Sequence, residues 1–213
     1  MAGEMRGADP NLWPTVAPEV IRSFFARRAR YVIYFAGYGE LGYQDDDCVG
    51  RIVRHILKDI PVSSALVHCG TLLRINGLDG IADVYVIAKE LGFETTGIHP
   101  SIAKEFADTH RVSPYCDHVF FVPDDTWGGF IHDTQALSPT LRLHLAVSDE
   151  IVIIGGGKHA ADEMTAFARA AKVIRYFPAE MNASASQGWC EKAGIDVLDV
   201  RGAAQAAWDQ LRR

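Results

Sequence analysis

The 213-residue chain contains no run of about 20 apolar residues, the length that a membrane-spanning helix needs. Its N-terminal segment holds acidic side chains and two prolines where a secretory signal peptide would be apolar. The four cysteines form no C-x-x-C pair, which argues against a zinc site and against a disulfide scaffold. These absences predict a cytoplasmic protein with no metal, no cofactor and no membrane partner.

The chain also has few basic residues relative to acidic ones. The chain has 21 Lys and Arg residues against 27 Asp and Glu residues, which gives a net charge of −6, and the two signs are interspersed. We therefore expect no nucleic-acid partner. Apolar residues make up 48% of the chain, enough for a globular protein with its own core. We expect an irregular N-terminal arm over residues 1–17 and one domain over residues 18–213.

Short apolar runs alternate along the chain with helical patterns. The predicted strands are 31–35, 65–68, 94–98, 118–122, 151–154, 173–177 and 196–198. The predicted helices are 18–28, 47–57, 81–91, 101–108, 139–147, 160–171, 184–192 and 203–211. Nearly continuous apolar strands such as YVIYF and IVII are typical of a parallel sheet with both faces covered. The sequence thus predicts an α/β fold, a Rossmann-like three-layer sandwich with a mostly parallel sheet between helices.

Ligands of open α/β sheets bind beyond the carboxyl ends of the strands, so the loops after the strands are the candidate site. The first loop, from Gly37 to Gly42, matches G-x-G-x-x-G, and its candidate ligand-binding residues are Gly37, Tyr38, Gly39 and Glu40. The second strand ends without the acidic residue that binds a ribose in dinucleotide folds, which disfavours NAD and FAD. A tight turn is the alternative interpretation of this first loop, and a polar helix cap that of Glu40.

Small residues also follow the second, third and fifth strands of this alternation. The candidate ligand-binding residues there are Cys69, Gly70, Thr71, Gly97, Gly155, Gly156, Gly157, Lys158 and His159. Three successive glycines fill no core volume and cost backbone entropy, whereas a glycine loop before a helix suits an anion. A solvated loop is the alternative for Lys158 and His159. The histidines at the ends of the second and third strands, His68 and His99, are expected to be buried and hydrogen-bonded, with a catalytic side chain in the crevice as the alternative.

The stretch from Ala65 to Pro100, together with VSDEIVIIGGGKHAADE, resembles the LOG-like Rossmann group of the SLOG superfamily. LOG enzymes are phosphoribohydrolases that cleave the N-glycosidic bond of cytokinin nucleotides, and family relatives are commonly dimers. Gly156, Gly157 and Glu163 fall on the P-G-G-x-G-T-x-x-E motif, while Gly155 replaces its proline and His159 and Ala160 replace its Gly-Thr pair. Arg142 lies about two positions from the family's arginine. The resemblance thus implies Glu163 and Arg142 as catalytic residues and a homodimer as the assembly.

Two functions follow, and a third class is disfavoured. The first is a nucleotide N-glycoside hydrolase, in which the Glu163 carboxylate stabilises an oxocarbenium-like transition state. The second is a sensor or carrier that binds a nucleotide or ADP-ribose-like ligand without chemistry. In that case Glu163 only complements the dipole of its helix. The segment from Asp124 to Phe130, with two glycines and two aromatic residues, is predicted to be a flap over a base or a dimer contact. A DprA-like nucleic-acid protein is disfavoured by the acidic charge.

Overall fold

The computed structural model describes residues 7–28, 30–131, 134–193 and 202–212. Six strands form one parallel sheet in the order β6-β4-β2-β1-β7-β8. Their bounds are β1 (Tyr31–Gly37), β2 (Ala65–Cys69), β4 (Glu94–Pro100), β6 (His118–Val122), β7 (Glu150–Ile154) and β8 (Val173–Phe177). The predicted Rossmann-like α/β fold is confirmed, and every predicted strand within the described residues is present.

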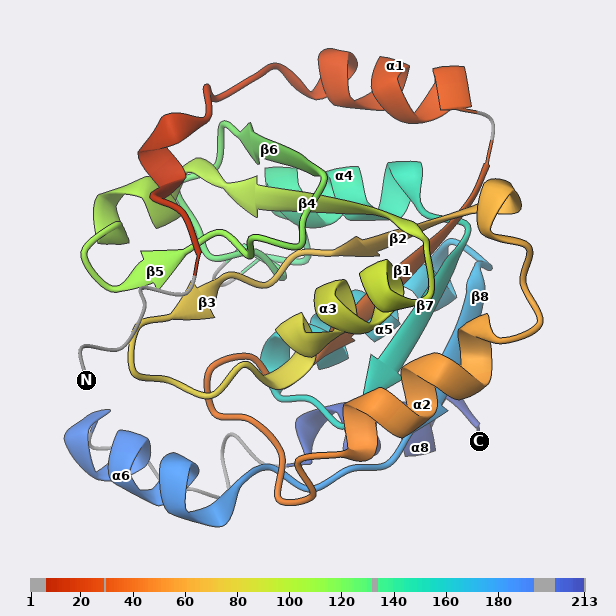
Figure 1. Cartoon of the computed structure of the whole chain (residues 1–213). Helices are drawn as coiled ribbons and strands as arrows, with labels where there is room; N and C mark the ends of the chain where they lie inside the picture. The colour runs from red at the N-terminus through yellow and green to blue at the C-terminus, as the bar shows by residue number, and fades with distance from the viewer. Residues whose placement is uncertain (1–6, 29, 132–133, 194–201, 213) are drawn as a thin grey trace.

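Helices cover both faces of this sheet (Figure 1). One face carries α2 (Cys48–Leu57) and α3 (Asp83–Glu90), whose buried side chains share a core with β1 and β2. The other face carries α1 (Pro18–Arg28), α4 (Pro139–Val147), α5 (Lys158–Arg169) and α8 (Ala203–Leu211). A further helix, α6 (Ala183–Ala193), follows β8. The three layers place all loops that follow the parallel strands at one edge of the sheet, which we call the carboxyl edge.

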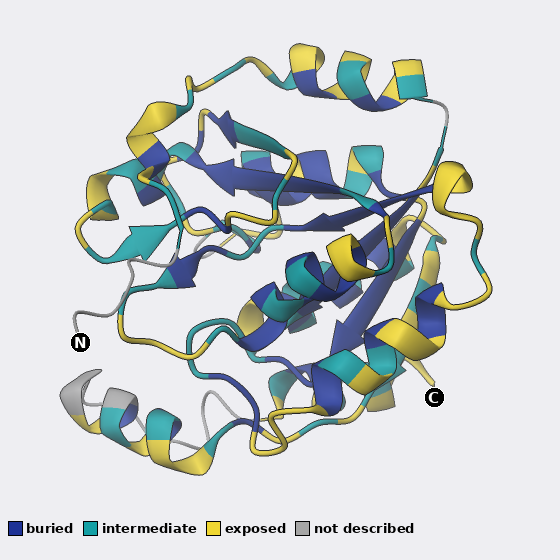
Figure 2. Cartoon of the chain, viewed as in Figure 1, coloured by how far each residue is buried: buried dark blue, intermediate teal, exposed yellow. Residues whose placement is uncertain are grey.

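Alternation along the central strand explains why its sequence is apolar throughout. Ile33 and Phe35 of β1 pack into the core under α2 and α3, whereas Tyr34 and Ala36 pack under α5 and α8. Successive side chains of a strand point to opposite faces, so a strand covered on both sides needs apolar residues at every position. Figure 2 shows this burial along the middle strands, with exposed residues concentrated on the outer helices and loops.

The structure differs from the predicted elements in three places. The segment predicted as a helix over 101–108 is the 3-10 helix η4 (Ser101–Phe106). Its turns are tighter than those of an α-helix. The predicted helix 81–91 begins as the 3-10 turn η3 (Gly80–Ala82) and continues as α3. Two short strands that sequence reasoning missed, β3 (Leu73–Arg74) and β5 (His110–Arg111), form an antiparallel pair. The predicted strand 196–198 lies outside the described residues.

The described part of the arm lies along the margin of the sheet. The Val16 amide donates to the carbonyl of Phe121 in β6 at 2.8 Å, and the Ala8 amide donates to Val112 at 3.0 Å. Between them, η1 (Pro10–Leu12) begins at Asp9, whose carboxylate accepts from the Asn11 amide at 2.8 Å. The arm is irregular, as predicted, but it is hydrogen-bonded to the body of the chain.

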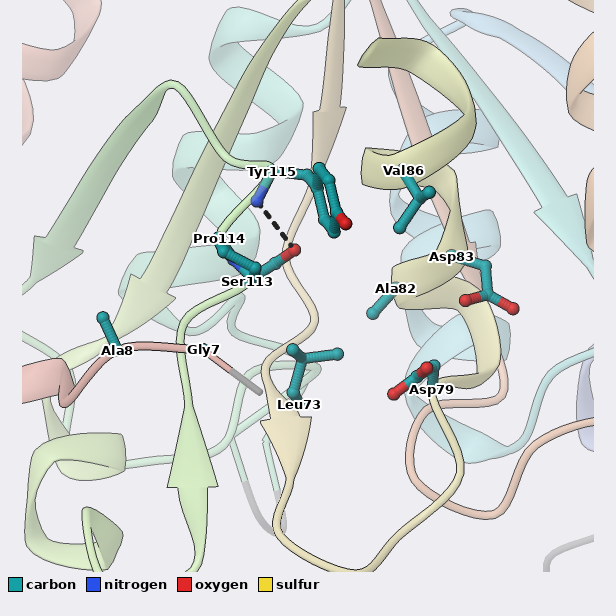
Figure 3. A pocket seen from close by; sticks show the side chains of 10 residues that line it. All are labelled: Gly7, Ala8, Leu73, Asp79, Ala82, Asp83, Val86, Ser113, Pro114 and Tyr115. Atoms are coloured by element: carbon teal, nitrogen blue, oxygen red, sulfur yellow. Dashed lines mark hydrogen bonds between the residues drawn. The ribbon is translucent and has the colours of Figure 1, made fainter. Parts of the chain in front are cut away.

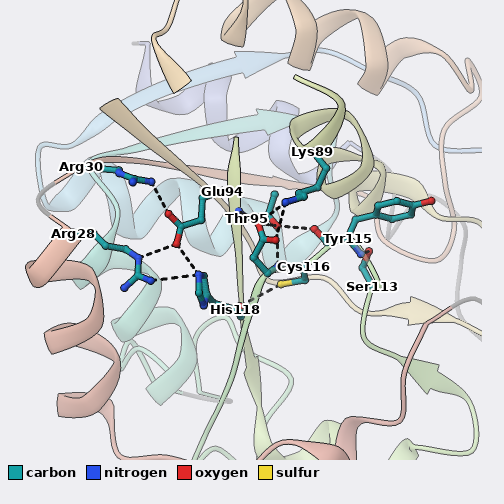
Figure 4. A network of polar contacts seen from close by, with 10 residues as sticks. Arg28, Arg30, Lys89, Glu94, Thr95, Ser113, Tyr115, Cys116 and His118 are labelled. Atoms are coloured by element: carbon teal, nitrogen blue, oxygen red, sulfur yellow. Dashed lines mark hydrogen bonds and ion pairs between the residues drawn. The ribbon is translucent and has the colours of Figure 1, made fainter. Parts of the chain in front are cut away.

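A polar network holds the amino ends of β4 and β6 together (Figure 4). Glu94 accepts from Arg28 at 2.9 Å and contacts Nε2 of His118 at 2.6 Å, while Lys89 donates to Asp117 at 2.8 Å. The cationic partners lower the pKa of the Glu94 carboxyl against the opposing effect of burial. The network lies at the edge opposite the glycine loops, so its role is to fix strand register rather than to bind ligand at the carboxyl edge.

In the described part of the chain, each helix is too short or too polar to cross a lipid bilayer.

Candidate functional site at the carboxyl edge

The strand order places a topological switch point between β1 and β7. The chain moves from β1 to β2 on one side, whereas β7 continues to β8 on the other. Gly37 at the end of β1 pairs with Ile154 at the end of β7, so the loops that follow these strands are neighbours. Open α/β sheets bind ligands at this position. Two of the glycine loops predicted from the sequence therefore lie together.

The first glycine loop is shaped by Tyr43. The Tyr43 hydroxyl donates to the Ile154 carbonyl at 2.9 Å and accepts from the Tyr38 amide at 3.0 Å. A side chain at Gly37 would overlap that hydroxyl, which explains the glycine there. The Tyr38 amide is thus occupied, and helix α2 begins only at Cys48. The loop matches G-x-G-x-x-G in sequence but does not open directly into a helix.

Glu40 of the same loop is held by the side chains of Arg74 and His110. Its carboxylate accepts from Arg74 at 2.7 Å and lies 3.7 Å from Nε2 of His110. These partners lower the pKa of the Glu40 carboxyl although burial acts in the opposite direction. Glu40 therefore joins the first glycine loop to the β3–β5 ribbon.

The loop after β7 owes its glycines to close packing. Gly155 and Gly156 have φ angles of +56° and +109°, in the left-handed region that favours glycine. A side chain at Gly155 would lie 2.6 Å from the Tyr38 ring. The Gly155 amide is engaged with the Phe177 carbonyl at 2.8 Å, whereas Gly157 is the N-cap residue of α5. The glycines of this loop are therefore packed against the chain, and the first turn of α5 follows them.

Lys158 and Asp162 anchor this first turn to the segment from Asp124 to Phe130. The exposed Lys158 ammonium donates to the Asp162 carboxylate at 3.0 Å. The same carboxylate accepts from the Phe130 amide at 3.1 Å, and a side chain at Gly129 would lie 3.1 Å from Nδ1 of His159. The Asp124–Phe130 segment thus reaches from β6 to the start of α5.

Trp127, in the middle of that segment, belongs to a partly exposed aromatic group. Its ring centroid lies 5.1 Å from that of Phe106 and 5.3 Å from that of His110. Trp127 is 44% exposed and Phe106 is 40% exposed. Because His110 also lies beside Glu40, this aromatic group stands next to the first glycine loop.

The loop after β2 is tied down on both sides. The Cys69 carbonyl accepts from Tyr85 at 2.6 Å, and the Gly70 carbonyl accepts from Nδ1 of His99 at 3.1 Å. Thr71 hydrogen-bonds to the Cys69 sulfur through its backbone and its side chain, but burial outweighs this and raises the pKa of the thiol to about 11. Cys69 is therefore a neutral thiol at neutral pH.

Gly97 in β4 leaves room for His99 and Tyr85. A side chain at Gly97 would lie 2.7 Å from Nε2 of His99 and 3.0 Å from the Tyr85 hydroxyl. His99 is buried, and burial lowers its pKa to about 4. The expectation of a buried, hydrogen-bonded His99 is confirmed, and Gly97 serves its packing.

Glu163 lies in the second turn of α5, where the Tyr34 hydroxyl of β1 donates to its Oε1 at 2.6 Å. Burial raises the pKa of the Glu163 carboxyl to about 7, the Asp162 carboxylate adds to the rise, and the Tyr34 hydrogen bond opposes it. Both the acid and the carboxylate are thus populated near neutral pH. A carboxyl with this property on the helix that follows β7 is a candidate for proton transfer.

A pair of buried histidines lies against Tyr34, and sequence reasoning missed one of them. Nδ1 of His68 lies 3.0 Å from the Thr96 carbonyl, and Nε2 of His68 lies 2.7 Å from Nδ1 of His144. The Tyr34 ring stacks on the His144 ring with centroids 4.5 Å apart and planes 9° apart. Burial lowers the pKa of His68 to about 3 and that of His144 well below its ordinary value. His68 is buried and hydrogen-bonded, as expected.

Helix α4 presents His144, rather than Arg142, to this group. The helix begins at Ser138, whose hydroxyl accepts from the Leu141 amide at 3.1 Å, and Pro139 fits the first helical position. Its inner face then carries His144, whereas Arg142 is exposed and donates to the Leu137 carbonyl at 3.2 Å. The groups that shift the pKa of Glu163 are Tyr34 and Asp162, and Arg142 is not among them.

A cavity of about 870 Å³ lies between α3 and the N-terminal arm (Figure 3). Its walls include Leu73, Val86 and the ring of Tyr115, with the carboxylates of Asp79 and Asp83 beside them. The volume is that of a small-molecule site. The two carboxylates disfavour a phosphate in this cavity.

Within residues 7–28, 30–131, 134–193 and 202–212, no group of three or more His, Cys, Asp or Glu side chains is arranged to hold a metal ion.

No protein-family model matches the chain, and no curated protein matches it. The fold and the geometry of the carboxyl edge are therefore the basis on which its function is proposed.

Proposed function

We propose that the chain is a nucleotide-binding protein of the LOG-like kind that hydrolyses the N-glycosidic bond of a nucleoside monophosphate or a related nucleotide. One observation carries this proposal: Glu163, whose pKa is raised to about 7, lies on the helix that follows β7 and is held by Tyr34 of β1, and these two strands flank the switch point. Open α/β sheets bind nucleotides at this position, and glycoside hydrolysis needs a carboxylate close to the sugar.

The chemistry assigns one role to each oxygen of Glu163. In the reaction, the bond between C1′ and the base nitrogen breaks, water adds its hydroxyl to C1′, and its proton reaches the departing base. The carboxylate stabilises the positive charge that develops on the sugar and orients the water. Because Tyr34 holds Oε1, the other oxygen of Glu163 is the one available to accept from that water.

The first turn of α5 is the proposed phosphate site. Gly157 precedes the helix, and Lys158 and His159 lie in its first turn. The partial positive charge of a helix N-terminus favours an anion, and a phosphate there would compete with the Asp162 carboxylate for the Lys158 ammonium. The aromatic group of Trp127 and Phe106 offers a face on which a base would stack. The resemblance to LOG enzymes also leads us to propose a homodimer.

A sensor or carrier without catalysis is the second candidate, and a specific observation favours it. The amides of Tyr38 and Gly155 are engaged within the chain, and Arg142 donates to a backbone carbonyl of its own chain. The site therefore lacks part of the phosphate-holding and cationic elements that the LOG motif supplies. Binding of a nucleotide-like or ADP-ribose-like ligand requires fewer of these phosphate-holding and cationic groups than hydrolysis does.

Base release distinguishes the two candidates. The purified protein is incubated with a panel of nucleoside monophosphates, NAD and ADP-ribose, and free base is quantified by chromatography. We expect release from at least one member, lost in Glu163→Gln and retained in Glu105→Gln, which changes an exposed glutamate away from α5. Saturable binding without release from any member would favour the sensor or carrier, and full activity of Glu163→Gln would refute the role of Glu163.

A further inference from the structure

The hydrogen bonds of the buried histidine pair fix the tautomer of His144. The Thr96 carbonyl only accepts, so Nδ1 of His68 carries the proton and Nε2 of His68 carries a lone pair. Nδ1 of His144 must then donate to that lone pair across 2.7 Å. A neutral His144 has one proton, so its Nε2 atom is an acceptor.

The surroundings hold this acceptor at the end of β2. His144 is 3% exposed, and the flat stack on Tyr34 fixes the plane of its ring. In the described part of the chain, Nε2 of His144 makes no hydrogen bond. A side chain at Gly70 would lie 3.0 Å from Nε2 and from Cε1. Because residue 70 has no side chain, the space in front of the nitrogen is kept for another group.

Among the described residues, the fully enclosed side-chain atoms without a hydrogen-bond partner are Thr140 Oγ1, Ser148 Oγ and Glu150 Oε1, and Nε2 of His144 is not one of them. Solvent therefore reaches this acceptor, and a hydroxyl group can take the place of water there. Tyr34 connects this acceptor to the proposed catalytic group, since its ring stacks on His144 and its hydroxyl binds Glu163. Both groups thus flank the same tyrosine, which lies in the middle of β1 opposite His68 of β2 and Ile151 of β7. A ligand whose sugar carbon lies at Glu163 would bring its sugar hydroxyls within reach of the loop after β2.

We propose that Nε2 of His144 binds a hydroxyl group of the ligand's sugar, with His68 holding the required tautomer. This inference rests on the proposed nucleotide function and names a binding residue for it. The contact selects a hydroxyl donor and rejects a phosphate oxygen, because a neutral imidazole nitrogen with a lone pair accepts and does not donate. Hydrogen bonds to sugar hydroxyls also strengthen in glycosidic transition states.

Nitrogen NMR of histidine-labelled protein tests the proposal directly. In the free protein, we expect the resonances of an unprotonated Nε2 and a protonated Nδ1 for His144. The probes are ribose 5-phosphate, AMP and 2′,3′-dideoxy-AMP. The first two are expected to shift the Nε2 resonance, and the dideoxy compound is not. A protonated Nε2, an unchanged resonance with every probe, or an equal shift with the dideoxy compound would overturn the proposal.

A substitution that fills the space in front of Nε2 gives a second test. Gly70→Ala is expected to weaken the binding of ribose 5-phosphate about tenfold in calorimetry, the effect of one lost hydrogen bond. Gly188→Ala is the matched control, because a side chain there has open space around it. Unchanged affinity in a folded Gly70→Ala protein would contradict the proposal. If that variant does not fold, the NMR comparison on the unmodified protein decides.

The outcomes separate this inference from the proposed function. A shift at His144 without base release would refute hydrolysis and leave the binding role intact. Base release from AMP without any shift at His144 would refute the binding role alone. Absence of binding by every probe in both assays would refute both.

Discussion

Acidification from pH 7 to pH 5 is expected to destabilise the protein through its buried histidines. His68 and His99 have pKa values of about 3 and about 4 in the folded chain, both lowered mainly by burial. In the unfolded chain each returns to about 6.5. The unfolded state therefore binds more protons, so the stability contributed by the neutral histidines is complete above pH 6.5 and is lost as the pH falls toward their folded pKa values.

The size of the effect follows from these values. Between pH 7 and pH 5, each of the two histidines loses about 2 kcal/mol of stabilisation, and His144 acts in the same direction. Glu163 acts oppositely, because its raised pKa of about 7 favours protonation in the folded state as the pH falls. It is partly exposed, so solvent screening limits its gain to about 1–2 kcal/mol. A net loss of about 2–3 kcal/mol remains from His68, His99 and Glu163 together, and the loss from His144 adds to it.

Urea unfolding at pH 7, 6 and 5, followed by circular dichroism, measures this change. Glu163→Gln removes the carboxyl whose protonation opposes the destabilisation. The loss of unfolding free energy in this variant over the same pH range is therefore expected to reach about 4 kcal/mol. Carboxyls with lowered pKa values, such as Glu40 and Glu94, lose their stabilisation mainly below pH 5 and do not confuse the comparison. A free energy of unfolding that stays constant or rises from pH 7 to pH 5 in Glu163→Gln would refute the reasoning.

Four further changes have expected outcomes. Glu163→Gln should raise the free energy of unfolding at pH 8 by about 2 kcal/mol, since it removes a partly buried carboxylate that is ionised at this pH; an unchanged urea midpoint would argue against the raised pKa. Tyr43→Phe should cost about 2 kcal/mol in urea unfolding, because two buried backbone groups lose their partner. Gly156→Ala should cost about 1–3 kcal/mol or more, since φ is +109°, whereas Gly188→Ala, inside helix α6, should stabilise by about 0.5–1 kcal/mol. Trp127→Ala should leave the melting temperature almost unchanged and weaken AMP binding about tenfold if a base stacks on it; equal AMP affinity would exclude stacking.

The fold could be predicted because local patterns and topology agree. Apolar strands alternating with amphipathic helices leave few solutions other than a parallel sheet covered on both faces. Helices 18–28, 139–147 and 203–211 have the predicted bounds. The β3–β5 ribbon was missed because two-residue strands carry no periodicity that a pattern can detect.

The site was harder to predict because long-range contacts decide how each loop residue is used. The pattern that begins at Gly37 predicts a phosphate-binding loop. In the structure, glycine is required at position 37 because a side chain there would overlap the hydroxyl of Tyr43. His144 was not identified from the sequence, since only the folded chain brings it to His68, 76 positions away. Glu163 was identified from a motif, but the Tyr34 partner that sets its orientation comes from the opposite end of the chain.

The arm along β6 bears on how the molecule avoids self-association. An outer strand with free amides and carbonyls is a template for pairing with other chains, and proteins commonly shield such strands. Here the Phe121 carbonyl of β6 already accepts from Val16, and the Lys104 ammonium donates to the Trp13 carbonyl at 2.6 Å, which fixes the arm over that margin. Removal of the arm would therefore uncover a strand capable of intermolecular pairing. We expect a chain without the arm to aggregate under conditions in which its core is still folded.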